Sequence, residues 1–218
     1  MKTIKNFVKK IYRFCFPSGH IIYLKELEKQ LTDMKSVLDL DCGRVSPLKD
    51  IKKNFFSVGV DLFSEYIEKS KEQRIHNEYR LINVLEIDKV FPKKSFDAVI
   101  ALDLIEHLNK EEGGLLIKKM EKLAKKKVII FTPNGFVEQK VKSEPFQEHK
   151  SGWSCREMKE LGYKCIGING IKFIPRERGN IILKPKKFWK IVSDISQKFV
   201  YRVPRFAFQI FCIKKDLS

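Results

Sequence analysis

Short, nearly continuous apolar runs recur along the chain between segments with helical periodicity. The runs cover residues 37–40, 56–60, 79–85, 96–102, 128–132, 162–169 and 206–213. Runs of this length without alternation are typical of strands buried on both faces of a parallel sheet. The segments with helical spacing are 21–31, 65–72, 111–127, 153–161 and 186–199. This order predicts an α/β fold, with a doubly wound, mostly parallel seven-stranded sheet and helices on both faces.

The first two runs end in residues suited to binding a nucleoside. The first is followed by a turn at Gly43 and by Ser46-Pro47, a helix N-cap with proline at the first helical position. A strand, a glycine turn and a helix start direct backbone N–H groups toward a ligand. The second run ends in Asp61, where an acid can accept hydrogen bonds from ribose hydroxyls. The G-x-G-x-x-G fingerprint of dinucleotide-binding proteins is absent from the sequence.

Four motifs occur along the chain, at residues 38–43, 59–62, 95–108 and 128–135. In order and spacing they resemble the class I S-adenosylmethionine-dependent methyltransferases, of the type 11/23-like group. The resemblance covers most of residues 35–170 and implies a Rossmann-like methyltransferase fold, whose last strand inserts antiparallel between strands five and six. Asp41 and Val45 stand where the family pattern has two of its three glycines.

The resemblance implies S-adenosyl-L-methionine as the cofactor. The motif after the first strand would hold its methionine portion, the acid after the second strand its ribose, and the end of the third strand its adenine. The residues that match these positions, with the acid after the fourth strand, are Asp39, Leu40, Asp41, Cys42, Gly43, Asp61, Leu62, Asn83, Val84 and Asp103.

A polar cluster follows the fourth and fifth runs. Asp103, Glu106 and His107 have i, i+3, i+4 spacing and share a face of a helical turn. His149 comes after the fifth run, whose carboxyl end borders the same crevice of a doubly wound sheet. We therefore expect His107 and His149 to face one acceptor site. In this interpretation Glu106 favours the protonated form of His107, which acts as general base.

A second interpretation of this cluster is a metal site. Some metal-dependent O-methyltransferases that the chain resembles carry an acid, an acid and a histidine at this spacing. They include enzymes of quinone biosynthesis and the small-RNA 3′-end 2′-O-methyltransferases. Two carboxylates and two imidazoles suit a divalent cation. We expect Asp103 to point into the cofactor pocket instead, which favours the base and assigns no metal.

The net charge of +17 indicates which classes of partner the protein could bind. It favours anionic partners such as a membrane surface or nucleic acid, with simple solubility as the alternative. Residues 1–15 and 186–199 both combine an apolar helical stripe with lysines. Such helices either lie on an anionic surface or cover the chain's own pocket and core. Five scattered cysteines without a C-x-x-C pair predict reduced thiols in the cytoplasm, with a peripheral membrane location as an extension of that prediction.

The sequence thus predicts a single methyltransferase domain over residues 1–218. It consists of a helical cap (1–34), a cofactor-binding core (35–170) and a C-terminal helix with the final strand (171–218). We expect O-methylation of a small-molecule, glycan or lipid acceptor. Two alternatives stay open: a metal-assisted RNA 2′-O-methyltransferase, and a non-catalytic basic scaffold whose cofactor pocket has degenerated at Asp41 and Val45.

Overall fold

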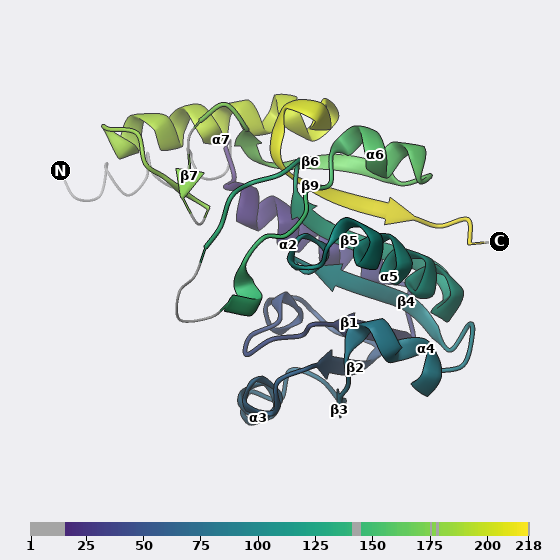
Figure 1. The fold of residues 1–218 in the computed structure, drawn as a ribbon. Coiled ribbons are helices and arrows are strands. Elements are labelled where there is room, and N and C mark those ends of the chain that lie inside the picture. Colours follow the sequence, from purple (N-terminus) through teal and green to yellow (C-terminus); the bar gives the residue numbers. More distant parts are fainter. Residues whose placement is uncertain (1–15, 141–144, 175, 178, 218) are drawn as a thin grey trace.

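The computed structural model of the protein describes residues 16–140, 145–174, 176–177 and 179–217 (Figure 1). Seven strands form one sheet in the order β3-β2-β1-β4-β5-β9-β6. All neighbours are parallel except β9, which pairs antiparallel with β5 and β6. The strands are β1 (Ser36–Leu40), β2 (Phe56–Asp61), β3 (Glu78–Leu81), β4 (Phe96–Leu102), β5 (Ala124–Pro133), β6 (Lys164–Ile171) and β9 (Ala207–Lys214). The predicted sheet, including its antiparallel final strand, is confirmed.

Helices lie on both faces of this sheet (Figure 1). They are α2 (Gly19–Leu31), α3 (Ser64–Glu72), α4 (Ile87–Val90), α5 (Lys110–Leu123), α6 (Cys155–Glu160) and α7 (Lys186–Arg202). Single 3₁₀ turns are η1 (Pro47–Asp50), η2 (Val84–Glu86), η3 (Ile105–His107), η4 (Pro145–Gln147) and η5 (Pro204–Phe206). A short hairpin, β7 (Arg176–Glu177) and β8 (Asn180–Ile181), lies between β6 and α7 in the sequence.

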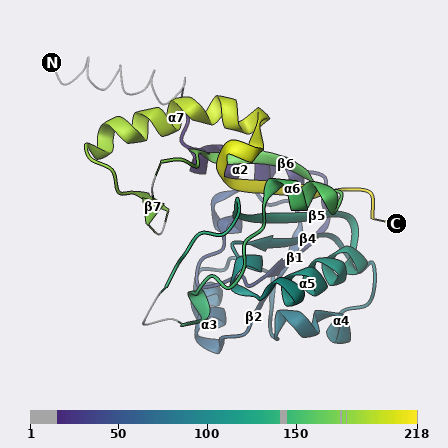
Figure 2. The same cartoon turned by 45° about the horizontal axis from the view of Figure 1, so that its top comes forward.

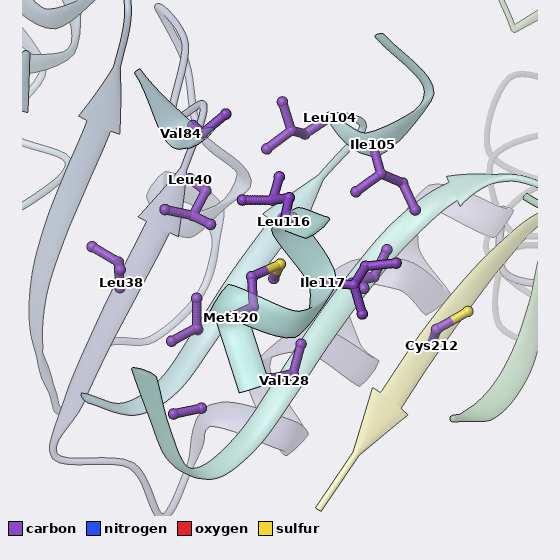
Figure 3. Close-up of a cluster of buried hydrophobic side chains, with 14 of the residues drawn as sticks. Leu38, Leu40, Val84, Leu104, Ile105, Leu116, Ile117, Met120, Val128 and Cys212 are labelled. Carbon is purple, nitrogen blue, oxygen red and sulfur yellow. The ribbon is translucent and has the colours of Figure 1, made fainter. Parts of the chain in front are cut away.

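Two buried apolar clusters, one on each face, hold the layers together. Leu38 and Leu40 of β1 join the cluster that includes Leu116 and Met120 of α5 (Figure 3). Val37, the alternate residue of the same strand, joins the cluster formed with α2. Because successive side chains of a strand point to opposite faces, one apolar strand supplies both cores. Val37, Leu38 and Leu40 of this strand are apolar for this reason.

The boundary between α5 and β5 differs from the prediction of a helix through residue 127. The helix ends at Leu123, and the lysines 125–127 belong to β5. Lys126 forms an ion pair with Asp97 at 3.0 Å, and the Lys127 ammonium donates to the Gln30 carbonyl at 2.7 Å. These lysines are therefore held by partners on neighbouring elements, and they do not interact with the dipole at the end of a helix.

The predicted end of the third strand was also wrong. The strand ends at Leu81, earlier than the apolar run suggested, because Asn83 caps the turn η2 that follows. Helix α3 begins at Ser64, and Phe63 stands at its cap position without a side-chain bond. Residues 1–15, predicted as an amphipathic helix, lie outside the described residues. Among the residues that the structure describes, every helix is too short or too polar to cross a membrane.

Candidate active site

The loop after β1 contains an aspartate and a glycine with left-handed backbone conformations. Asp41 has φ 58° and Gly43 has φ 60°, both left-handed. Aspartate tolerates this region better than most residues, since its short polar side chain can bond locally. A Cβ built on Gly43 would have its nearest heavy atom 4.0 Å away. Val45, at the other expected glycine, is 57% exposed. The two substitutions therefore leave open space beside the backbone of Gly43.

Asp61, at the end of β2, is tied to this loop. Its carboxylate accepts hydrogen bonds from the backbone N–H groups of Gly43, at 2.8 Å, and Phe63, at 2.9 Å. The residue is fully buried, and burial raises the pKa of its carboxyl above the usual value, although the two N–H bonds oppose that shift. Asp61 therefore stands at the predicted position and holds the first two loops together.

Asp39, in β1, is a second buried acid, and its carboxylate contacts two polar side chains. Its carboxylate accepts a hydrogen bond from the Ser46 hydroxyl at 2.6 Å and lies 3.4 Å from Nε2 of His76. Burial raises the pKa of Asp39 to about 7 and lowers the pKa of His76 to about 4. The side chain of His76 is buried beside Gly59. Cys42 of the motif is also buried.

The other predicted cofactor residues surround the same edge of the sheet. Leu62 is half exposed after β2. Asn83, exposed after β3, accepts a hydrogen bond from the Leu85 N–H at 2.9 Å, and Val84 is buried beside it. Burial, with the charge of Asp61 as a second cause, raises the pKa of Asp41 to about 7. Their contacts with a cofactor stay predictions.

Asp103 and Glu106 follow β4 in different environments. Asp103 adopts φ 56°, and its carboxylate accepts a hydrogen bond from the Gln209 amide at 3.1 Å. Glu106, in η3, is buried and accepts from the Thr132 hydroxyl at 3.0 Å. Burial raises the pKa of Glu106 well above its usual value, and the charge of Asp103 raises it further. Gln209 and Thr132 were missed by the sequence analysis because no motif marks them.

The rings of His107 and His149 lie 5.0 Å apart, centroid to centroid. Nδ1 of His107 lies 3.2 Å from the Glu148 carbonyl, and Nδ1 of His149 lies 2.6 Å from the Val137 carbonyl. A carbonyl only accepts hydrogen bonds, so each Nδ1 carries a hydrogen and each neutral ring keeps Nε2 as an acceptor. The expectation that the two histidines face one site is confirmed in geometry.

One part of that expectation was wrong. Glu106 does not favour the protonated form of His107, because burial lowers the pKa of His107 to about 4. The charge of His149 acts in the same direction, and burial also lowers the pKa of His149. Both rings are therefore neutral at physiological pH, because desolvation disfavours their charged forms.

These residues share a cavity of about 260 Å³ at the carboxyl edge of the sheet. Val137, Gln139, Gln147 and His149, after β5, line one side, and Gly179 with Phe208 and Gln209 of β9 lines another. One ligand atom each of Glu106, His107 and His149 lie within 4.8 Å of one another, a spacing that suits a metal ion. The carboxylate of Asp103 stands outside this cluster and pairs with Gln209. The cavity lining is Asp103, Glu106, His107, Pro133, Val137, Gln139, Gln147, His149, Gly179, Phe208 and Gln209.

The segment after β5 also reaches the β2 loop. Phe146 of η4 packs edge-to-face against Phe63, with ring centroids 4.9 Å apart. Phe63 follows Asp61 by two residues, so Phe146 lies beside the predicted ribose site, and the next residue, Gln147, lines the cavity. The sequence does not predict this contact, because an isolated phenylalanine in a polar loop carries no periodic signal.

Comparisons with known proteins agree with this architecture. A family model described as a methyltransferase domain matches residues 38–132. A search among curated proteins finds no match. The chain is similar in structure to an S-adenosylmethionine-dependent methyltransferase from Archaeoglobus fulgidus, with 18% identity, a TM-score of 0.59, and coverage of 95% of this chain and 99% of that one.

Two further solved structures complete the comparison. The Burkholderia thailandensis 1,6-didemethyltoxoflavin-N1-methyltransferase, solved with 1,6-didemethyltoxoflavin and S-adenosylhomocysteine, aligns at 11% identity and a TM-score of 0.57. That alignment covers all of this chain and 86% of the other. PH0226 from Pyrococcus horikoshii OT3 is 29% identical, but the match spans 50% of this chain and 51% of that one, with a TM-score of 0.44.

Proposed function

We propose that the chain is a class I S-adenosylmethionine-dependent methyltransferase and that it methylates an oxygen of a hydroxyl-bearing small molecule, glycan or lipid. The observation that carries the proposal is the pair of neutral imidazoles, His107 and His149, beside buried Glu106 in one cavity. Hydrogen-bond acceptors at such a site can hold a hydroxyl by its proton and leave the oxygen lone pair free to attack.

The residues at the edge of the sheet fit a cationic cofactor. The open space beside Gly43 leaves room for a ligand against the backbone. Asp41, with its pKa raised to about 7, is partly uncharged at neutral pH, which reduces its repulsion of the cofactor carboxylate. S-adenosylmethionine supplies a methyl group on a positively charged sulfur. In this proposal the loop 40–43 binds its methionine portion, Asp61 its ribose, and Asn83 with Val84 its adenine.

His107 is suited to accept the hydroxyl proton late in the reaction. With a pKa of about 4 it does not deprotonate a free alcohol. The hydroxyl becomes strongly acidic as its oxygen gains the methyl group, and a weak base then suffices. The hydrogen bond from Nδ1 to the Glu148 carbonyl fixes the ring, so that Nε2 remains the accepting atom. Orientation of the reactants and exclusion of water supply the rest of the rate acceleration.

A metal-assisted version of the same reaction is the second candidate. It is favoured by the 4.8 Å cluster of Glu106, His107 and His149, because a histidine must be neutral to bind a metal and both rings are neutral. In this version the three residues would hold a divalent cation, which would lower the pKa of an acceptor hydroxyl. The RNA 2′-hydroxyl is an acceptor for either version.

Methyl transfer from tritiated S-adenosylmethionine to a panel of hydroxyl compounds, glycans, lipids and RNA 3′ ends tests the proposal. We expect His107→Ala to lower the rate by roughly 10²–10⁴-fold, the contribution of a general base. The exposed His20, on α2, gives the matched control His20→Ala. Transfer only to nitrogen acceptors, or unchanged transfer by His107→Ala, would contradict it.

Manganese binding separates the two versions. Electron paramagnetic resonance of added Mn²⁺ should show tight binding by the wild type if the metal-assisted version holds. Glu106→Gln and His149→Ala should then weaken that binding, whereas His20→Ala should leave it unchanged. If Mn²⁺, Mg²⁺ and Zn²⁺ do not bind and methyl transfer persists in a chelator, the general-base version stands.

A further inference from the structure

Helix α7 presents a polar face to the protein. Ser193 and Gln197 are buried, and the Gln197 side chain accepts from the Gly170 N–H and donates to the Gly167 carbonyl, both at 2.9 Å. The Ser196 hydroxyl accepts from the Ile171 N–H at 3.0 Å. These bonds join α7 to the backbone of β6. The polar face of this helix is therefore its buried face, opposite to the usual arrangement.

Close contact between the backbones fixes this orientation. A Cβ on Gly167 would lie 2.1 Å from the Val200 carbonyl oxygen, and one on Gly170 would lie 2.3 Å from the Ser193 hydroxyl. The helix therefore rests directly on two glycines of β6. It cannot rotate to bury another face without losing both the contact and the hydrogen bonds.

The solvent side of α7 is apolar. Phe188, Ile191, Ile195 and Phe199, which we call the outer stripe, are 53%, 44%, 50% and 50% exposed. Their spacing of three, four and four residues places them on one helix face, over a length of about 16 Å. Phe199 stacks on Phe206 with centroids 5.8 Å apart, which extends the apolar surface. Figure 2 shows that α7 lies on the outside of the molecule, beyond β6.

The outer stripe is bordered by positive charge. Lys187 and Lys198 are exposed, and each is the sequence neighbour of a residue of the stripe. Arg202 follows Phe199 at the C-terminal end of the helix. Residues 186–202 contain five basic residues and one acid, Asp194. That acid is buried on the inner face and pairs with Lys190 at 3.1 Å. The outward surface of α7 is therefore both apolar and cationic.

We propose that the outer stripe of α7 docks on an anionic lipid bilayer. A basic amphipathic helix lies at such a surface with its apolar side chains among the acyl chains and its lysines at the lipid phosphates. A second copy of the same face would bring lysines against lysines. Residues 1–15, which lie outside the described residues, carry five basic residues and no acid, so their charge also favours an anionic surface. This proposal goes beyond methyl transfer, and it does not depend on whether the protein has that activity.

Co-sedimentation of the full chain with lipid vesicles tests it. We expect binding to vesicles of phosphatidylcholine with phosphatidylserine, little binding to phosphatidylcholine alone, and release in about 0.5 M salt. The double variant Phe188→Ser/Ile195→Ser should reduce affinity by about tenfold or more, because each side chain loses apolar area that the bilayer would bury. The matched control is Val90→Ser/Leu115→Ser, whose residues are each 48% exposed on α4 and α5.

Trp189 provides a local reporter. It follows Phe188 on α7, whereas the other tryptophan, Trp153, is buried beside η3. Vesicles with brominated acyl chains should quench the fluorescence of the wild type, and Trp189→Phe should remove that quenching. Quenching that persists in Trp189→Phe would place the contact elsewhere and overturn the assignment to α7.

The remaining outcomes also decide the proposal. If the wild type does not bind the anionic vesicles, or if the outer-stripe variant binds as well as the wild type, the proposal fails. A lowered Tm of that variant with unchanged vesicle binding would indicate that residues 1–15 cover the stripe. A change in mass by light scattering with unchanged vesicle binding would indicate a second copy. None of these measurements depends on methyl-transfer activity.

Discussion

The carboxylate of Asp61 accepts a hydrogen bond from the Gly43 N–H at 2.8 Å and so joins the end of β2 to the loop after β1. The same carboxylate accepts from the Phe63 N–H at 2.9 Å. One buried acid thus fixes the two loops that would hold the methionine portion and the ribose of the cofactor. The arrangement of this pair underlies the first prediction.

Asp61→Ala should weaken binding of S-adenosylmethionine by roughly 1.5–3 kcal/mol, the range for hydrogen bonds to a charged group. The loss combines the ribose contact with the freed Gly43 loop. Calorimetric titration with S-adenosylmethionine and S-adenosylhomocysteine measures it, and circular dichroism checks the fold. The exposed Asp50 gives the control Asp50→Ala, which should bind as the wild type does. Unchanged affinity in a folded Asp61→Ala would show that Asp61 does not bind the ribose.

Phe146→Ala should speed the release of S-adenosylhomocysteine by about two- to tenfold, since an edge-to-face pair contributes about 0.5–1.5 kcal/mol. The ring packs on Phe63 beside the predicted ribose site. Stopped-flow displacement measures the release rate, and Phe173→Ala, on an exposed ring far along the chain, is the control. Equal release rates in the wild type and Phe146→Ala would mean that the contact does not hold the ligand.

His76 should make folding stability depend on pH. Its folded-state pKa of about 4 lies below the ordinary value of 6.5, because burial disfavours the charged ring. Its contribution is therefore fully present above pH 6.5 and is lost as the pH falls from 6.5 through 4. Asp39, with a raised pKa, acts in the opposite sense, so the comparison must isolate His76.

Urea unfolding of the wild type and His76→Asn between pH 4 and 7.5 provides that comparison. The packing change offsets the two curves by a constant, whereas the proton linkage makes their difference shrink toward low pH, by about 3 kcal/mol at most. A difference that stays constant over this range would contradict a buried neutral His76.

Gly167→Ala should destabilise the protein by about 2–3 kcal/mol, because its Cβ would meet the backbone carbonyl of Val200 at 2.1 Å and push α7 away from β6. Gly114→Ala is the matched control. Its Cβ meets nothing within 4 Å inside α5, so the variant should be more stable by about 0.5–1 kcal/mol. Urea unfolding measures both, and equal stabilities of the two variants would show that α7 is not held this closely.

The apolar runs by themselves predicted the seven strands of the sheet, whereas the antiparallel insertion of the last strand was implied by the family resemblance. A run such as 96–102 buries every residue of β4, and only a strand covered on both faces offers that environment. The acids after β2 and β4 were also foreseen at their positions, because parallel strands end at one edge of the sheet and the next residues must lie there. The approach of His107 and His149 followed from the same rule.

Only the tertiary structure decided protonation, partners and exposure. Burial set the pKa of His107 against the effect expected from Glu106, and burial depends on every element around the ring. Asp103 pairs with Gln209, a partner 106 residues away that no local spacing announces. The apolar stripe of α7 has the periodicity of a core helix, yet glycines 167 and 170 of β6 receive its polar face. Periodicity shows that a helix has two faces, and the surface it packs against decides which of them meets the solvent.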